Sequence, residues 1–353
     1  MLEALIDQFG DGAVLMMAGA LVGVVFGITA QHSRFCLRAA TVELAEGQVG
    51  PKLHVWLIAF SAAVFCVQGA ISFGIVELSE ARPLAATGSI SGAVVGGLMF
   101  GAGMIFSRGC ASRLLVLSAT GNLRALLTGL VLTLVAQASL RGALSPAREW
   151  LSGLWLVPGG DARNLLTHLG VGSGLATWVA GTALATTLIV AARAGAQLSR
   201  MLAATGVGIA IGLGWWTTYA ISQMSFEVIP LSSVTFTGPS TDTLMGLVNA
   251  AGMPMSFGVG LVPGVFIGAG FMAFASREAR IERFGPDTPM ERYMIGAVLM
   301  GFGSMLAGGC AVGAGMSGGS IFAVTAWIAV FCMWVGAMVT HRLMLRRPAE
   351  QAA

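Results

Sequence analysis

Charged residues are scarce in this sequence. Only 10% of its 353 residues are Asp, Glu, Lys or Arg, whereas a soluble globular domain carries about 25%. Histidine occurs four times at distant positions, and no Cys-x-x-Cys pair is present among the five cysteines. These shortages exclude an ordinary soluble domain, and they give no support to a zinc site or a thioredoxin-like redox motif.

Apolar residues are abundant instead. They make up 56% of the chain, which also contains 50 glycines, and the mean hydropathy is +0.83. Runs of about 20 apolar residues are long enough to cross the hydrocarbon core of a bilayer as helices. The sequence therefore predicts an all-α, polytopic membrane protein embedded in a lipid bilayer. The expected spans are 13–30, 53–76, 89–107, 122–140, 174–192, 200–222, 255–275, 291–307 and 319–341.

Three shorter apolar pieces follow some of these spans. Residues 109–120, 240–252 and 310–318 are too short to cross a bilayer. Irregular backbone at membrane depth is tolerated where it is buried in protein or lines a cavity. We therefore expect these pieces to form half-helices or re-entrant turns beside a pathway.

The basic residues indicate an orientation. If the N-terminus lies outside, only Arg82, Arg141, Arg148 and Arg163 of the 19 Lys and Arg fall in outer segments. The positive-inside rule therefore favours an outer N-terminus and an inner C-terminus. The arginines are scattered between spans rather than clustered, so the net charge of +3 does not indicate a nucleic-acid partner.

An internal repeat becomes visible when the sequence is shifted by 200 residues. The shift places Gly96, Gly101, Gly103, Gly109 and Cys110 on Gly296, Gly301, Gly303, Gly309 and Cys310. The expected spans before the two cysteines would cross the membrane in opposite directions. This pattern predicts two inverted-topology halves, residues 1–195 and 196–353, with a substrate site near the midplane between them.

The cysteines differ in their surroundings. Cys66 and Cys332 lie within spans and are expected to be packing residues. Cys36, Cys110 and Cys310 each follow a span at a break, where a pathway would narrow. A membrane-embedded thiol can act as a small filler, a redox centre, a soft metal ligand or a weak S–H donor to an anion.

Arginines beside these breaks favour an anion over a metal cation such as Cu(I). Arg34, Arg108 and Arg113 flank Cys36 and Cys110, and an ionised side chain at such a place is costly unless it has a role. The same arginines could instead be cytoplasmic anchors. Gly109 and Gly309 directly precede two of the cysteines, and a positive φ is expected where a helix breaks and turns back, at Gly308-Gly309 and Gly318-Gly319. The residues thus predict a path for an anion that thiols can recognise, with no cofactor or metal.

Three motifs resemble those of a known family. FGAGMIFSRGCASRLL, GFGSMLAGGCAVGAGMSGG and SRFCLRAA are similar to motifs of the YeeE/YedE membrane proteins, a family of sulfur-transport proteins. The resemblance implies a bacterial inner-membrane protein whose inverted halves form an hourglass with thiols at its constriction. It implies that Cys110, Cys310 and Cys36 pass thiosulfate along by S–H contacts without a stable covalent intermediate. A small cytosolic sulfur-carrier protein is a further implied partner.

One departure from the family puts the substrate in question. The second-half counterpart of SRFC usually contains another cysteine, whereas this chain reads WWTTYAISQMSFE there. Ser225 or Ser222 could supply a hydroxyl donor in place of that thiol. Sulfite, sulfate, a selenium analogue and an organosulfur anion are therefore alternatives to thiosulfate.

The sequence predicts a non-enzymatic permease for a sulfur-containing anion, with thiosulfate as the foremost candidate. A membrane-embedded sulfur-transfer protein that forms a persulfide on Cys36 or Cys110 is the main alternative. A structural subunit that transports nothing is a third. No ATP-binding loop occurs, so any energy source would be an ion gradient or a separate protein.

Overall fold

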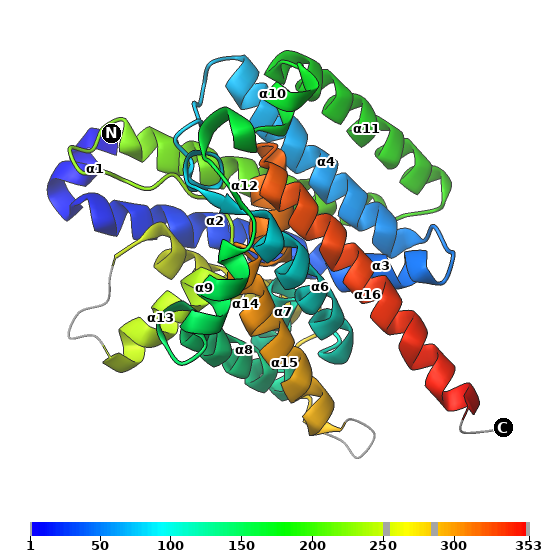
Figure 1. Ribbon diagram of the computed structural model, residues 1–353. Coiled ribbons are helices and arrows are strands. Elements are labelled where there is room, and N and C mark those ends of the chain that lie inside the picture. The colour runs from blue at the N-terminus through cyan, green and yellow to red at the C-terminus, as the bar shows by residue number, and fades with distance from the viewer. Residues whose placement is uncertain (1, 250–254, 284–288, 351–353) are drawn as a thin grey trace.

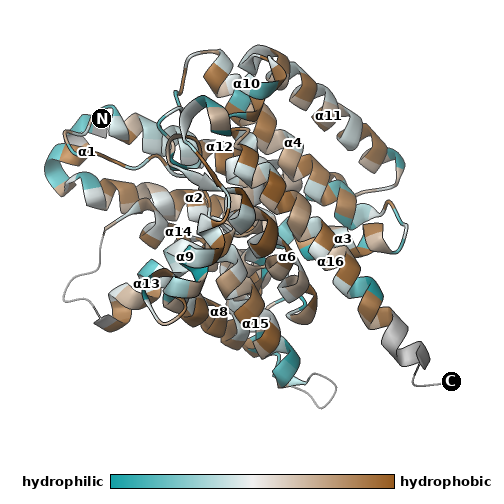
Figure 2. Ribbon diagram, in the orientation of Figure 1, coloured by the Kyte–Doolittle hydropathy of each residue, from teal (hydrophilic) through white to brown (hydrophobic). Residues whose placement is uncertain are grey.

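The nine predicted spans are confirmed. The computed structural model describes residues 2–249, 255–283 and 289–350, and within these ranges nine helices are long and apolar enough to cross a membrane (Figure 1). Apolar residues run along most of these helices, and polar residues gather at their ends (Figure 2). The spanning helices are α2 (Asp11–Ser33), α4 (Pro51–Ser72), α6 (Ile90–Phe106), α8 (Leu123–Arg141), α11 (Ser173–Arg193), α12 (Leu198–Ser222), α14 (Phe257–Ala275), α15 (Met290–Leu306) and α16 (Val324–Glu350).

Short elements connect and interrupt the spans. Three of them, α7, α13 and η2, lie where half-helices were expected, although residues 250–252 of the second piece lie outside the described residues. The half-helix α3, which follows Cys36, was not predicted. The short helices are α1 (Leu2–Phe9), α3 (Leu37–Ala45), α5 (Arg82–Ala85), α7 (Ala111–Ala119), α9 (Ser145–Gly153), α10 (Leu165–Leu169), α13 (Thr237–Asn249), the 3-10 turn η1 (Gly160–Arg163) and the π-helical η2 (Ala311–Gly318). Two short strands, β1 (Gly88–Ser89) and β2 (Leu156–Val157), pair antiparallel.

Glycines bring several helices into backbone contact. Gly19, Gly23 and Gly27 of α2 lie against successive turns of α14, which runs parallel to α2. Lipid tails are as apolar as leucine, so membrane helices gain little from hydrophobic burial, and close backbone approach supplies packing instead. These glycines therefore serve helix packing. The same kind of contact joins α6 to α16 and α4 to α12.

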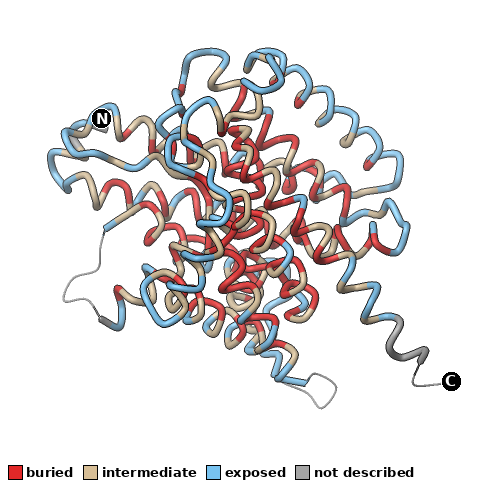
Figure 3. Tube along the Cα trace, viewed as in Figure 1, coloured by how far each residue is buried: buried red, intermediate tan, exposed pale blue. Residues whose placement is uncertain are grey.

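The buried residues concentrate where these pairs meet. Figure 3 shows them in the middle of the bundle, whereas α11 lies at its edge, packed on α4 and largely exposed. Of the glycines expected to take a positive φ, Gly308 does so at 82°, but Gly319 is at −65°. The turn before α16 is made by Phe322 instead, at φ 55°.

Candidate functional site

Each of the three candidate cysteines lies where a spanning helix ends and a short helix begins. Cys36 is the N-cap of α3, Cys110 that of α7 and Cys310 that of η2. The Cys310 sulfur accepts a hydrogen bond from the Gly313 N–H at 3.4 Å. The first turn of a helix has N–H groups without intrahelical partners and carries a partial positive charge. Each sulfur therefore lies at the end of a helix that attracts anions.

A left-handed residue makes the break before each cysteine. Arg34 has φ 57°, Arg108 has φ 54° and Gly308 has φ 82°, and each lies two residues before its cysteine. Such a residue ends a helix and redirects the chain. It is uncommon for a residue other than glycine, and two of the four described cases are these arginines. Gly309 is needed for space, because an added Cβ would lie 2.9 Å from the Ala314 nitrogen. At Gly109 the nearest atom to an added Cβ would belong to the Leu114 side chain at 3.4 Å, an ordinary contact.

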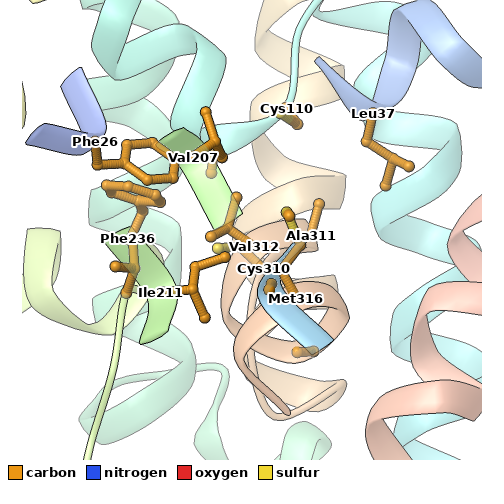
Figure 4. Close-up of a cluster of buried hydrophobic side chains, with 14 of the residues drawn as sticks. Phe26, Leu37, Cys110, Val207, Ile211, Phe236, Cys310, Ala311, Val312 and Met316 are labelled. Carbon is orange, nitrogen blue, oxygen red and sulfur yellow. The ribbon is translucent and has the colours of Figure 1, made fainter. Parts of the chain in front are cut away.

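The fold brings the three thiols into one buried cluster. Cys36 and Cys110 lie close enough for their side chains to interact, and the Cys110 sulfur is 3.3 Å from the Ser112 hydroxyl. The helix α7 that follows Cys110 contacts η2, which follows Cys310. Figure 4 shows Cys110 and Cys310 among the same apolar side chains. Cys110 is 0% exposed and Cys310 is 1% exposed, so the sulfurs are closed off from solvent.

Phe236 occupies the place in the second half that corresponds to Cys36. It directly precedes α13, and its carbonyl accepts a hydrogen bond from the Ser240 N–H at 2.8 Å. The Cys36 carbonyl accepts one from Ala40 in the same way. The two positions differ by the same 200 residues that relate Cys110 to Cys310. The Phe236 ring packs on the Phe26 ring with their centroids 5.1 Å apart (Figure 4).

This placement corrects the expectation for Ser225 and Ser222. Both lie at the end of α12 or just after it, and neither begins a half-helix. The Ser225 hydroxyl accepts a hydrogen bond from the Glu227 N–H at 3.0 Å, and the Ser222 hydroxyl donates to the Tyr219 carbonyl at 2.8 Å. The chain between α12 and α13 is much longer than the break at Cys36, so the position that corresponds to Cys36 lies farther from the end of the span than Ser225 does.

Arg113 is one of the three arginines that flank the candidate cysteines in the sequence, and the structure places it at the site. It lies in the first turn of α7, close enough to both Cys36 and Cys110 for electrostatic interaction. Its guanidinium donates a hydrogen bond to Gln31 Oε1 at 3.2 Å. The sequence signal for Arg113 was its position three residues after Cys110, because this spacing in the first turn of α7 directs the side chain towards the break. Arg108, which the sequence did suggest, is exposed.

Arg34 is joined to a carboxylate from the far end of the chain. Its Nη2 lies 2.8 Å from Glu278 Oε1, and Gln31 Nε2 donates to Glu278 Oε2 at 2.9 Å. The hydrogen bond from Arg34 lowers the pKa of Glu278 below its ordinary value of 4.5. Among the described residues there is no group of three or more His, Cys, Asp or Glu side chains that could hold a metal ion.

Comparisons with known proteins show which proteins this chain is similar to. The family model described as Sulphur transport matches residues 32–339. A protein of Escherichia coli (strain K12) named Thiosulfate transporter TsuA is 26% identical over 358 residues, which cover 96% of this chain and 97% of the relative. A Spirochaeta thermophila protein with the same name is 26% identical over 349 residues, which cover 94% of this chain and 100% of the relative.

Proposed function

This chain belongs to the sulphur transport family, and on that premise we propose that it is a membrane permease for thiosulfate. The observation that carries the proposal is that Cys36, Cys110 and Cys310 all lie in the same buried core, each at the start of a short helix. Two relatives named thiosulfate transporters, aligned over nearly the whole chain, support it. Because these relatives are named as transporters, they favour a permease over an enzyme.

The proposed chemistry uses weak contacts to both ends of the anion. The terminal sulfur of thiosulfate is soft and accepts S–H contacts from the thiols, while its oxygens accept N–H groups from the first turns of α3, α7 and η2. No covalent bond forms or breaks. Thiols and backbone dipoles hold a dianion less firmly than fixed cations would, so the anion can leave for the next site, which conduction requires.

Passage requires the apolar cluster around the thiols to separate. Val207, Ile211 and Phe236 are all nearly or fully buried beside Cys310 (Figure 4). An unsolvated dianion cannot enter such a surrounding at acceptable cost. The arrangement described here is therefore a closed one, with the Phe26–Phe236 ring contact as part of the barrier.

The two inverted halves, 1–195 and 196–353, are part of the proposal. The packing supports them, because contacts come in matched pairs: α6 with α16 and α15 with α8, α2 with α14 and α12 with α4. We also propose an inner bacterial membrane with the N-terminus outside. Segments assigned to the inner side meet one another, as Arg34 meets Glu278 and His341 meets Glu46.

Complementation tests the proposed function. A host without its own sulfate and thiosulfate uptake would receive this protein and one sulfur source at a time: thiosulfate, sulfite or sulfate. We expect growth on thiosulfate, lost in Cys110→Ala and in Cys310→Ala. Cys66→Ala is the matched control, since Cys66 lies at the contact of α4 with Gly212 of α12. Normal growth of both pathway variants would overturn the relay.

A second candidate is favoured by the contact of Cys36 with Cys110 and by Arg113 beside them. A thiolate at Cys36 would attack the terminal sulfur of thiosulfate, forming a persulfide while sulfite leaves with the electron pair of the S–S bond. Mass spectrometry of the protein after turnover distinguishes the two. A mass increase of one sulfur atom on Cys36 or Cys110 would favour sulfur transfer, and its absence during uptake favours the relay. The cytosolic sulfur-carrier partner stays a prediction of the family resemblance.

A further inference from the structure

A polar, open cavity of about 310 Å³ lies on the side assigned to the cytoplasm, and Arg113, which also interacts with Cys36 and Cys110, is part of its lining. The end of α2, the helix α7 and the chain that follows α14 line it. Four arginines line it, against only two glutamates. One of the two, Glu282, is already held by Asn122 and by Arg124, whose Nη2 is 3.0 Å from the carboxylate. The lining therefore carries an excess of positive charge. The charged lining residues are Arg34, Arg113, Arg277, Arg280, Glu278 and Glu282.

The donors of this cavity already converge on an anionic group. Both oxygens of Glu278 are engaged, one by Arg34 at 2.8 Å and the other by the Gln31 amide at 2.9 Å. Arginine presents a planar set of N–H donors that suits carboxylates and other oxyanions alike. The carboxylate thus marks a place where this protein binds two oxygens of an anion.

Arg113 connects this place to the constriction. It donates to Gln31 Oε1 at 3.2 Å, which orients the Gln31 amide so that its Nε2 faces Glu278. The same guanidinium lies beside the sulfurs of Cys36 and Cys110. An anion that leaves the thiols therefore meets Arg113 first and the position of the Glu278 carboxylate next.

The backbone that carries Glu278 is fixed, so only its side chain is free to move. The chain after α14 is hydrogen-bonded along the turn between α7 and α8: Arg280 N–H to Thr120, Glu282 N–H to Gly121, and Leu123 N–H to Glu282. Gly121 has φ 97°, and an added Cβ would lie 2.6 Å from the Arg280 carbonyl. The Arg34 and Glu278 side chains are 59% and 38% exposed. Exposed ion pairs are weak and exchange partners readily.

We propose that this cavity is a binding subsite for a divalent sulfur oxyanion, and that the Glu278 carboxylate occupies the anion's place until the substrate displaces it. The inference rests on the proposed permease function. A dianion with three oxygens outcompetes a single carboxylate for Arg34, Gln31 and Arg113. When the anion departs, Glu278 returns and prevents the same anion from rebinding.

Equilibrium binding of radiolabelled thiosulfate to the purified full-length protein tests the subsite. Glu278→Gln removes the competing charge and keeps a side chain of the same size. Thiosulfate should bind about two- to sixfold more tightly to Glu278→Gln than to wild type. This factor corresponds to the free energy of the exposed ion pair that thiosulfate must break in wild type. Arg34→Gln should weaken binding by about tenfold, because a charge-assisted hydrogen bond is lost. Glu149→Gln is the matched control, since this exposed carboxylate pairs with Arg148 at 3.2 Å elsewhere.

The outcomes separate this inference from the proposed function. Unchanged binding in Glu278→Gln would overturn the role of the carboxylate, and unchanged binding in both Arg34→Gln and Arg113→Gln would overturn the subsite. If cysteine variants abolish growth on thiosulfate while the Glu278, Arg34 and Arg113 variants bind thiosulfate normally, the permease function is supported and the subsite is refuted. If the protein instead binds sulfate with the same ranking of variants but transports no thiosulfate, the subsite stands and the proposed substrate falls. Glu278→Asp keeps the charge on a shorter side chain, so its affinity for thiosulfate should lie between those of wild type and Glu278→Gln. Binding by this variant also shows that a change at this position does not prevent folding.

Discussion

Replacing Gly27 with alanine should destabilise the protein and lower its uptake together. An added Cβ at Gly27 would lie 2.8 Å from the Ala269 nitrogen and still closer to the Val265 carbonyl oxygen. Both are backbone atoms of α14, so neither can rotate away, and α2 and α14 must move apart. Overpacking of this kind costs about 1–3 kcal/mol, while alanine regains about 0.5–1 kcal/mol of helix propensity. The net expectation is a loss of up to about 2.5 kcal/mol.

Gly129→Ala is the matched control for this change. Gly129 also lies within a spanning helix, but its added Cβ would only touch Leu114 at 4.0 Å. This variant should keep the propensity gain of about 0.5–1 kcal/mol without the overpacking cost. The unfolding midpoints of both variants can be measured by heating the protein in detergent and labelling the cysteines that become exposed. This works because Cys36, Cys110, Cys310 and Cys332 are buried in the folded protein. Equal midpoints for the two alanine variants would refute the close backbone contact between α2 and α14.

Uptake links this perturbation to function. Gly27 lies one turn before Gln31 and less than two turns before Arg34. Separation of α2 from α14 therefore moves these donors away from Glu278, which α14 positions. We expect Gly27→Ala to transport thiosulfate more slowly than Gly129→Ala at equal amounts of folded protein in vesicles. Equal transport rates in spite of a lowered unfolding midpoint would show that the close packing of α2 on α14 does not matter for transport.

Further predictions concern individual side chains. Mild oxidation with copper-phenanthroline should join Cys36 to Cys110 in a disulfide, because the two thiols lie close together. The disulfide should block uptake until a reductant is added. Peptide mass spectrometry that finds no such link would contradict the closeness of the two thiols. The lowered pKa of Glu278 means that its ion pair is complete above pH 4.5 and is lost only as the pH falls through the lower folded-state value. The ratio of thiosulfate affinities between Glu278→Gln and wild type should therefore stay constant from pH 6 to pH 8, and a ratio that changes there would disprove this assignment. Phe236→Cys should place a fourth thiol in the constriction and shift the preference among sulfur anions in competition assays, whereas Ser225→Cys should not. Arg163→Gln should lower the unfolding midpoint by the equivalent of about 1–3 kcal/mol, because the buried guanidinium donates to the Ala86 carbonyl and to Thr325 Oγ1; an unchanged midpoint would contradict this.

The sequence by itself determined the class of protein and the number of spans. Whether a segment crosses a bilayer depends on the summed apolarity of about 20 adjacent residues, which is a local property. The breaks at Cys110 and Cys310 were also visible, because a shifted copy of the chain reproduces the glycines and the Gly-Cys pair. These features indicated the fold class and two of the thiols, and the break after the first span indicated the third, Cys36.

Only the tertiary structure decided which residues meet. Gln31 and Glu278 lie 247 residues apart in sequence, and no local pattern predicts that they share a hydrogen bond. Phe236 rather than Ser225 takes the place that corresponds to Cys36, because the loop after α12 is longer than the break after α2. Contacts of this kind depend on which glycine-lined faces of distant helices pack together, and that packing fixes positions across the bundle rather than along the chain.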